Sequence, residues 1–366
     1  MDGFKARAVR TAGLGCAAIT AALALAVPGG AAGAQDKVLA PSEIAAAAPK
    51  ADWVAIAPAD LLVMDLAPNV QGKPRRVVIQ LIPAPFSQGW VGNIRKLAEA
   101  RFWDGLSINR VQDNYVVQWG DADGEDKARA RKLPDGLKVV PQRDYTAKFT
   151  PDLFRQRYTA WGKRDAIERP GPMVVAPAGA TPAAGEDRSF ADAYSVNVGF
   201  ARGFPIGMSY KVRSDYTDPR TAHEDNQPDQ VWPVHCYGMV GVGRDMPPNT
   251  GTGAELYTVI GHAPRHLDHN IALVGRVIEG IEHMSSLLRG TGALGFYETA
   301  AERTPIVSVR LGSEVPGLPS YEYLSTESRS FAAYADARAN RRDAFFIRPA
   351  GGADICNIPV PVRRAN

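Results

Sequence analysis

The stretch FWDGLSINRVQDNYVVQWGD, residues 102–121, decides the fold of this 366-residue chain. Residues 106–111 and 115–119 are rich in β-branched and aromatic side chains, and the three residues between them are turn formers, so the stretch predicts a β-hairpin. Arg110 lies inside the first predicted strand. Because an unpaired buried charge is very costly, Arg110 either points to water or occupies a site where its guanidinium has partners.

Six further segments have strand-like composition, namely residues 61–66, 76–81, 238–242, 255–260, 271–278 and 306–311. With the hairpin they make eight strands, which suit a closed antiparallel barrel because closure leaves no exposed strand edge. Apolar residues recur at helical spacing in residues 91–102 and 279–288. The sequence therefore predicts a mainly β chain with a closed eight-stranded antiparallel barrel and two helices.

The hairpin resembles the signature of the cyclophilin-type peptidyl-prolyl cis-trans isomerases. The signature consists of an aromatic-Asp-Gly turn, an Arg-Val strand, an aromatic residue and Gln-x-Gly-Asp, and its positions here are Phe102, Asp104, Gly105, Arg110, Val111, Tyr115, Gln118, Gly120 and Asp121. Asn109 stands where the family usually has His, and Tyr115 stands where it usually has Phe. The resemblance implies a barrel capped by two helices, proline-containing polypeptides as substrates, and no cofactor.

A second block of the sequence is similar to later motifs of the same family. Residues 238–244 resemble Gly-x-(Leu/Val)-Ser-Met-Ala-(Asn/Arg), and residues 249–259 resemble Asn-Thr-x-Gly-Ser-Gln-Phe-Phe-Ile with one extra residue. Glu255 stands where Gln is usual, and Ile271 occupies the place where many members carry His.

The resemblance implies roles for these residues. Arg110 would donate toward the prolyl nitrogen and stabilise the twisted amide, whose rotation otherwise meets a barrier of about 18–20 kcal/mol. Gln118 would orient the guanidinium or bond the substrate backbone, and Tyr115 completes the catalytic group. The residues expected to contact the substrate are Val116, Gly243, Arg244, Glu255, Leu256, Tyr257, Leu267 and Ile271, of which Gly243 and Arg244 would pair its main chain.

Glu255 leaves two alternatives open, because a carboxylate near Arg110 would either position the guanidinium or occupy it and weaken catalysis. Together with Leu256 and Ile271, it also keeps a second functional interpretation open, a catalytically weak cyclophilin-like module that binds proline peptides or acts as a chaperone. A barrel that binds a small apolar ligand is a third interpretation, and it predicts an enclosed cavity.

The amino terminus has the features of a secretory signal peptide. A short basic region with Lys5, Arg7 and Arg10 precedes the apolar run 12–27 and the small residues 32–34, which predicts cleavage after Ala34. A membrane anchor is the alternative, but the apolar run is shorter than the roughly 18 residues that a spanning helix needs. We therefore expect an exported protein, periplasmic in a Gram-negative source, without stable membrane insertion after cleavage.

The rest of the chain divides into an N-terminal extension (35–60), a cyclophilin-like domain (61–313) with an insertion (122–235), and a C-terminal extension (314–366). Within the insertion, the spacing of Phe154, Tyr158 and Trp161 predicts a helix, residues 170–185 a surface loop, and residues 193–212 additional strands. Residues 328–342 of the C-terminal extension have a helical pattern.

Two cysteines, Cys236 and Cys356, remain after removal of the signal peptide. In an oxidising compartment such a pair often forms a disulfide, and two buried free thiols are the alternative.

Charge and spacing argue against several other function classes. The formal net charge is only +3 and the basic residues are scattered, so nucleic acid is not an expected partner. His262, His266 and His269 lie close together, but Pro264 interrupts a helical face and no carboxylate or Cys completes an obvious site, so we expect no metal. The glycines within 290–295 match a dinucleotide-binding pattern but follow a predicted helix rather than a strand.

Overall fold

The computed structural model describes residues 38–150, 153, 192, 194–195, 197–210, 228–348 and 353–365. The predicted signal peptide, the predicted helix with Phe154, Tyr158 and Trp161, and the predicted loop 170–185 lie outside the described residues. Within the described part of the chain, no helix is long and apolar enough to cross a membrane.

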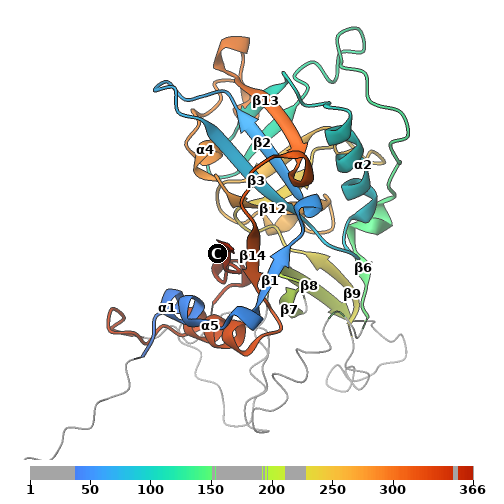
Figure 1. Cartoon of the computed structure of the whole chain (residues 1–366). Coiled ribbons are helices and arrows are strands. Elements are labelled where there is room, and N and C mark those ends of the chain that lie inside the picture. Colours follow the sequence, from blue (N-terminus) through green and yellow to red (C-terminus); the bar gives the residue numbers. More distant parts are fainter. Residues whose placement is uncertain are drawn as a thin grey trace, which may run out of the picture. The chain divides into compact units, whose positions relative to one another are not determined.

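Eight antiparallel strands close into a barrel, in the order β10-β11-β5-β4-β13-β2-β3-β12 (Figure 1). Their bounds are β2 Leu61–Leu66, β3 Arg75–Leu81, β4 Ser107–Val111, β5 Val116–Gly120, β10 Met239–Val242, β11 Leu256–Val259, β12 Leu273–Glu279 and β13 Thr304–Leu311. Each coincides with one of the eight predicted segments to within about two residues at either end. The predicted barrel is therefore confirmed.

The two predicted helices are also present. Helix α2 (Gln88–Glu99) begins and ends three residues earlier than predicted, and it buries Val91, Ile94 and Leu97 in the main core, as the apolar spacing predicts. Trp90, outside the predicted segment, is buried with them. Helix α4 (Glu282–Ser285) is shorter than expected because β12 runs through Glu279 and Gly280 follows at φ +82°, a left-handed conformation that separates the strand from the helix.

The four described strands of the insertion form a sheet of their own. Its strands are β6 Ala147–Lys148, β7 Asn197–Ala201, β8 Phe204–Tyr210 and β9 Pro228–Pro233, in the order β6-β9-β8-β7. The strands predicted within residues 193–212 are thus confirmed as β7 and β8. Strand β9 leads through His235 and Cys236 directly into barrel strand β10.

The N-terminal and C-terminal extensions fold together. A third sheet pairs β1 (Trp53–Ile56) with β14 (Tyr321–Leu324), which in turn pairs with β15 (Val362–Arg364), and α1 (Pro41–Ala47) contacts α5 (Arg329–Ala339). Helix α5 lies within the predicted helical segment, and Ser328 caps it by accepting from the N–H of Phe331.

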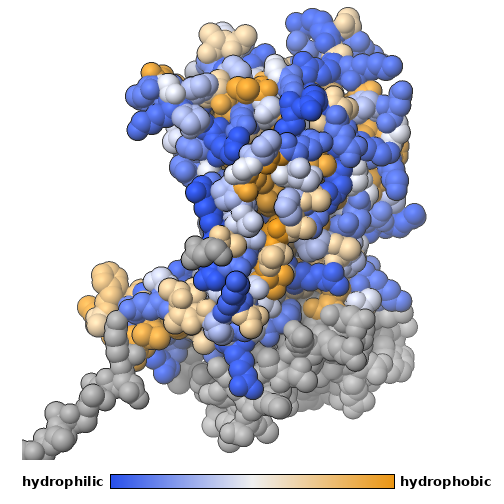
Figure 2. Space-filling view, viewed as in Figure 1, coloured by the Kyte–Doolittle hydropathy of each residue, from blue (hydrophilic) through white to orange (hydrophobic). Residues whose placement is uncertain are grey.

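This third sheet packs against the outer face of the barrel. Ile56 and Tyr321 share one apolar cluster with Leu61, Val63 and Val78 of the barrel strands β2 and β3. On the face seen in Figure 2, hydrophilic residues predominate over the barrel, and apolar residues gather around β1, where Val54 is exposed. The extensions therefore cover the part of the barrel surface formed by the apolar side chains of Leu61, Val63 and Val78.

A disulfide joins Cys236, just before β10, to Cys356 of the C-terminal extension. Of the two alternatives that the sequence left open, the disulfide is the one that the structure contains. It closes a loop with a sequence separation of 120 residues, so its loss frees a long segment of the unfolded chain.

We expect replacement of both cysteines by serine to lower the free energy of unfolding by about 4 kcal/mol, since closure of so long a loop restricts the unfolded state. Urea unfolding of the wild type and the double variant, each with and without a thiol reductant, measures this effect. The reductant should destabilise only the wild type. An equal reductant effect on both proteins would contradict the assignment.

Candidate active site

Arg110 lies on β4 and points toward three hydrogen-bond acceptors. Its Nε donates to the carbonyl oxygen of Leu294 at 2.8 Å, its Nη1 donates to Gln118 Oε1 at 3.2 Å, and its Nη2 donates to Gln112 Oε1. A guanidinium has five N–H donors, so these contacts leave two of them for another acceptor. Burial lowers the pKa of Arg110, because desolvation disfavours the charged form.

Two aromatic rings flank the Arg110 guanidinium. Its central carbon lies 5.7 Å from the ring centre of Tyr115 and 5.2 Å from that of Phe296, both within the range of a cation–π contact. The contacts with two rings and three acceptors fix the guanidinium in one orientation. The predicted catalytic group of Arg110, Gln118 and Tyr115 thus comes together in the structure.

The loop that supplies Leu294 and Phe296 was not expected at this site. Its glycines allow a close approach to β4: Gly290 donates to the carbonyl oxygen of Val111, and Gly295, at φ +79°, has no room for a Cβ, which would lie 2.6 Å from the Cα of Gln112. The glycine spacing that resembles a nucleotide motif is therefore explained by packing against the arginine strand.

Glu255 reaches Arg110 through Gln118. Gln118 Nε2 donates to Glu255 Oε2 at 3.2 Å, while Gln118 Oε1 accepts from Arg110. Burial raises the pKa of Glu255 from 4.5 to about 7, and the nearby carboxylates of Asp121 and Glu125 add to the rise, while the hydrogen bond from Gln118 opposes it. Of the two alternatives for Glu255, this geometry favours positioning of the guanidinium over its direct occupation.

Glycine is required at position 120 by the same carboxylate. Gly120 has φ +152°, and a Cβ there would lie 2.4 Å from Glu255 Oε1. Asn109, which stands at the usual His position, donates from its buried amide to the carbonyl oxygen of Gly120 at 3.0 Å. Both residues hold the hairpin against Glu255.

An apolar cluster adjoins the arginine. Tyr115, which contacts Arg110, packs with Ile271 against the buried residues Val116, Tyr257 and Val259. Leu256 instead belongs to the main core cluster, because neighbouring residues on a strand point to opposite faces. We therefore retain Val116, Tyr257 and Ile271 in the candidate site and place Leu256 in the core.

The remaining predicted residues border this region. Leu267 ends the short 3-10 turn Arg265–Leu267 that precedes Ile271. The Gly243 N–H donates to the carbonyl oxygen of Glu255 at 2.9 Å, so it is used within the barrel rather than for a peptide. Arg244 Nε donates to the carbonyl oxygen of Asn270 at 2.9 Å and ties the end of β10 to the same loop.

No protein-family model and no curated protein matches the sequence. Among solved structures, a cyclophilin from Hirschia baltica, AquaCyp293, is similar with a TM-score of 0.54 and 20% identity, over 86% of this chain and 94% of that chain. The chain has a cyclophilin-like fold. A cyclophilin-type isomerase from Cryptosporidium parvum, crystallised in the presence of the dipeptide Ala-Pro, matches with a TM-score of 0.32 and 8% identity over 68% of this chain and 98% of that chain, which is too distant to support an inference.

Strand β11 pairs with β5 of the arginine hairpin, so the two sequence blocks that resemble cyclophilins lie side by side. Among the described residues, no group of three or more His, Cys, Asp or Glu side chains could hold a metal ion. The candidate site combines a fixed guanidinium, a glutamine, a carboxyl group whose pKa burial raises to about 7, and an apolar cluster.

We expect Glu255→Gln to stabilise the protein at pH 8 by about 2 kcal/mol and to have little effect at pH 4. The folded-state pKa lies above the ordinary value of 4.5, so the folded protein loses stability as the pH rises through 4.5 to about 7. Urea unfolding at both pH values measures the difference, with Glu298→Gln as an exposed control. A stabilisation of equal size at both pH values would contradict the assignment.

Proposed function

We propose that this protein is a peptidyl-prolyl cis-trans isomerase that acts on X-Pro bonds of exported polypeptides. The observation that carries the proposal is the Arg110 guanidinium, which three acceptors and two rings hold in place beside an apolar cluster, with two N–H groups left over. Such a preorganised donor is what rotation about a prolyl amide requires.

The proposed reaction breaks no covalent bond. Rotation removes the amide resonance, and the prolyl nitrogen becomes pyramidal with a localised lone pair. The N–H groups of Arg110 donate to this lone pair, which stabilises the twisted state more than either planar isomer. Tyr115 and Ile271, the partly exposed members of the apolar cluster, hold the proline ring while the rest of the peptide turns, and the buried Val116, Tyr257 and Val259 pack against them. The mechanism needs no cofactor.

Glu255 acts through Gln118 in this mechanism. When Glu255 is charged, its oxygen is a strong acceptor for Gln118 Nε2, which keeps Gln118 Oε1 turned toward Arg110. When Glu255 is protonated, this preference weakens and the glutamine amide is free to turn. The charged form is therefore the one that positions the guanidinium.

The proposed location is the periplasm of a Gram-negative source, or the exterior of the cell otherwise. The support is the signal-peptide pattern of residues 1–34 and the disulfide between Cys236 and Cys356, a bond that persists in oxidising compartments. The proposed partners are unfolded or partly folded proline-containing polypeptides, whose folding the isomerase would accelerate.

A second candidate function is a proline-peptide binding or chaperone module with weak catalysis. Two observations favour it: the Gly243 N–H is already used within the barrel, and Val116, Tyr257 and Val259 are each less than a twentieth exposed. A substrate would reach the apolar cluster mainly through its partly exposed members, Tyr115 and Ile271.

We expect Arg110→Ala to lower the isomerisation rate by about a hundredfold, a typical loss for removal of one transition-state donor. NMR exchange between the cis and trans forms of a short X-Pro peptide measures this rate. The matched control is Arg348→Ala, since Arg348 is an exposed arginine of the C-terminal extension. A wild-type rate no faster than the uncatalysed one, with peptide binding retained, would replace the isomerase by the binding module.

The isomerisation rate should increase as the pH rises through about 7, because deprotonation of Glu255 fixes Gln118 toward Arg110. In Glu255→Gln the rate should be lower at pH 8 and independent of pH between 6 and 8. A pH series of the same NMR exchange experiment tests this. If Glu255→Gln is faster than the wild type at pH 8, the carboxylate occupies the guanidinium rather than positioning it.

A further inference from the structure

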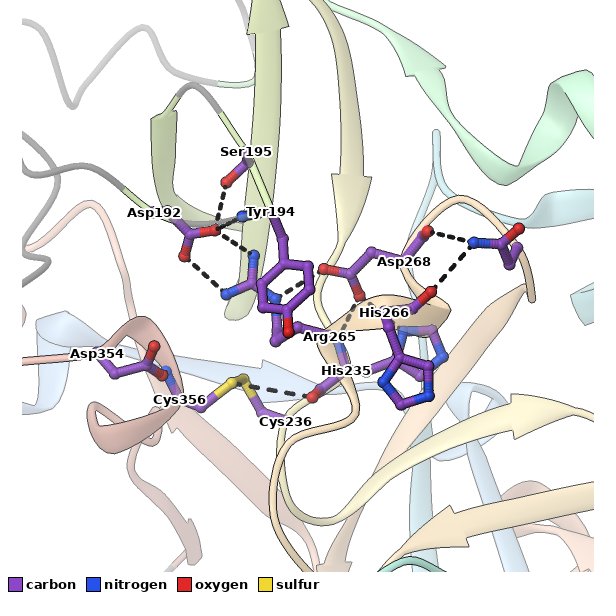
Figure 3. A network of polar contacts seen from close by, with 11 residues as sticks. Asp192, Tyr194, Ser195, His235, Cys236, Arg265, His266, Asp268, Asp354 and Cys356 are labelled. Carbon is purple, nitrogen blue, oxygen red and sulfur yellow. Dashed lines mark hydrogen bonds and ion pairs between the residues drawn. A yellow bond between two sulfur atoms is a disulfide. The ribbon is translucent and has the colours of Figure 1, made fainter.

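A buried polar network links Asp192, Arg265, Asp268 and His235 (Figure 3). Asp192 of the insertion accepts from both terminal nitrogens of Arg265, at 2.8 and 2.9 Å, and Arg265 Nε donates to Asp268 Oδ2 at 2.7 Å. Asp268 Oδ1 accepts from the backbone N–H of His235 at 3.0 Å and lies 2.8 Å from its ring nitrogen Nδ1. The contacts connect the insertion to the segment before β10.

The network is closed to solvent and internally paired. His235 is fully buried, and Arg265 and Asp268 are 4% and 6% exposed. Burial alone would raise the pKa of Asp268, but the hydrogen bonds from His235 and Arg265 and the charge of Arg265 outweigh it and hold this pKa below its usual value. Both carboxylate oxygens of Asp268 are therefore satisfied, as a buried charge requires.

The network ends on the apolar cluster. His235 Nε2 lies 2.7 Å from the hydroxyl oxygen of Tyr257, and the two rings are nearly parallel, with 9° between their planes. Tyr257 belongs to the candidate proline-holding cluster, so its ring is attached at the tip to a buried imidazole. Because Asp268 accepts at Nδ1, a neutral His235 presents Nε2 as the acceptor for the Tyr257 hydroxyl.

Gly241 provides the space for this hydroxyl. Gly241 and Tyr257 are directly opposite in the β10–β11 pair, and a Cβ at position 241 would lie 2.2 Å from the Tyr257 hydroxyl oxygen. A buried hydroxyl without a partner costs about 1–3 kcal/mol. Position 241 therefore has no side chain where the hydroxyl lies, and His235 supplies the partner that the buried hydroxyl requires.

We propose that His235 and Asp268 are positioning residues that fix the Tyr257 ring in the apolar cluster, and that the insertion supports them through Asp192. The role in catalysis rests on the proposed function. Asp268 fixes the imidazole, the imidazole fixes the tip of the Tyr257 ring, and Arg265 carries the contact to Asp192.

The disulfide lies next to the same residue. Cys236 follows His235 in sequence, and the Sγ of its partner Cys356 lies 3.9 Å from the carbonyl oxygen of His235. The insertion and the C-terminal extension thus meet at one buried histidine. Both segments lie outside the two sequence blocks that resemble cyclophilins, so the network gives them a common function.

The test uses Tyr257→Phe, His235→Gln and the double variant in the full-length protein. We expect each single variant to raise the KM for an X-Pro peptide by about fivefold while kcat stays within about twofold, since the loosened wall weakens binding. The double variant should be no worse than the single ones, because all three remove the same contact. His262→Gln, at an exposed histidine, is the matched control.

A readout independent of activity is the ¹³C-methyl NMR shifts of Val116, Val259 and Ile271, which pack with the Tyr257 ring. Their shifts should change in the single variants, while those of Val63 and Val78 on the barrel's outer cluster should not. Unchanged shifts and KM in Tyr257→Phe and His235→Gln would overturn the inference.

If the wild type shows no isomerisation, the proposed function fails. The methyl shifts, together with the Kd of a proline peptide, then still decide whether His235 positions Tyr257. If His235→Gln does not fold, Tyr257→Phe alone decides, because it leaves the Asp268 contacts in place.

Discussion

Strand register in the closed barrel is the constraint on which the candidate site depends. Arg110 is opposite Gln118 in the β4–β5 pair, Gln118 is opposite Tyr257 in the β5–β11 pair, and Tyr257 is opposite Gly241 in the β11–β10 pair. Side chains that are directly opposite in antiparallel strands share one face, so these residues form a single row. A slip of one residue in any pair would turn part of the row to the other face.

The sequence was sufficient to predict the barrel because each strand carries its own local pattern of β-branched and aromatic residues, and the arginine and glutamine lie within such patterns. It was not sufficient to predict the acceptor at Leu294, since every residue has a carbonyl group and no side-chain signal marks the one that Arg110 uses. Leu256 shows a different limit: the alternation of a strand separates it from Tyr257, although the two are adjacent in sequence. His235 carried no local signal, because its three partners, Tyr257, Asp268 and Cys356, are 22, 33 and 121 residues away in the sequence.

Glu255 lowers the stability of the folded protein but fixes the orientation of the Gln118 side chain. Burial of its carboxyl group, with a smaller contribution from two nearby carboxylates, raises its pKa to about 7 and makes its charged form unfavourable in the folded protein. A glutamine would avoid this cost but could present either its amide nitrogen or its oxygen to Gln118. A carboxylate presents only acceptors, so it imposes one orientation on Gln118 and thereby on the contact with Arg110.

The buried network differs from Glu255, because each of its charged groups is paired with an opposite charge or a hydrogen-bond partner. Arg265 lies between the carboxylates of Asp192 and Asp268, and the imidazole of His235 links Asp268 to the Tyr257 hydroxyl. Removing water from such groups is unfavourable, and their pairing offsets this free energy only if the surrounding chain keeps them in place.

The segment before β10 has no regular secondary structure of its own, so its position depends on β9 of the insertion on one side and the Cys356 disulfide on the other. If the insertion made no packing contact with the segment before β10, His235 would be accessible to water. The complete burial of His235 therefore argues that the insertion and the C-terminal extension are part of the barrel's structural core at this point.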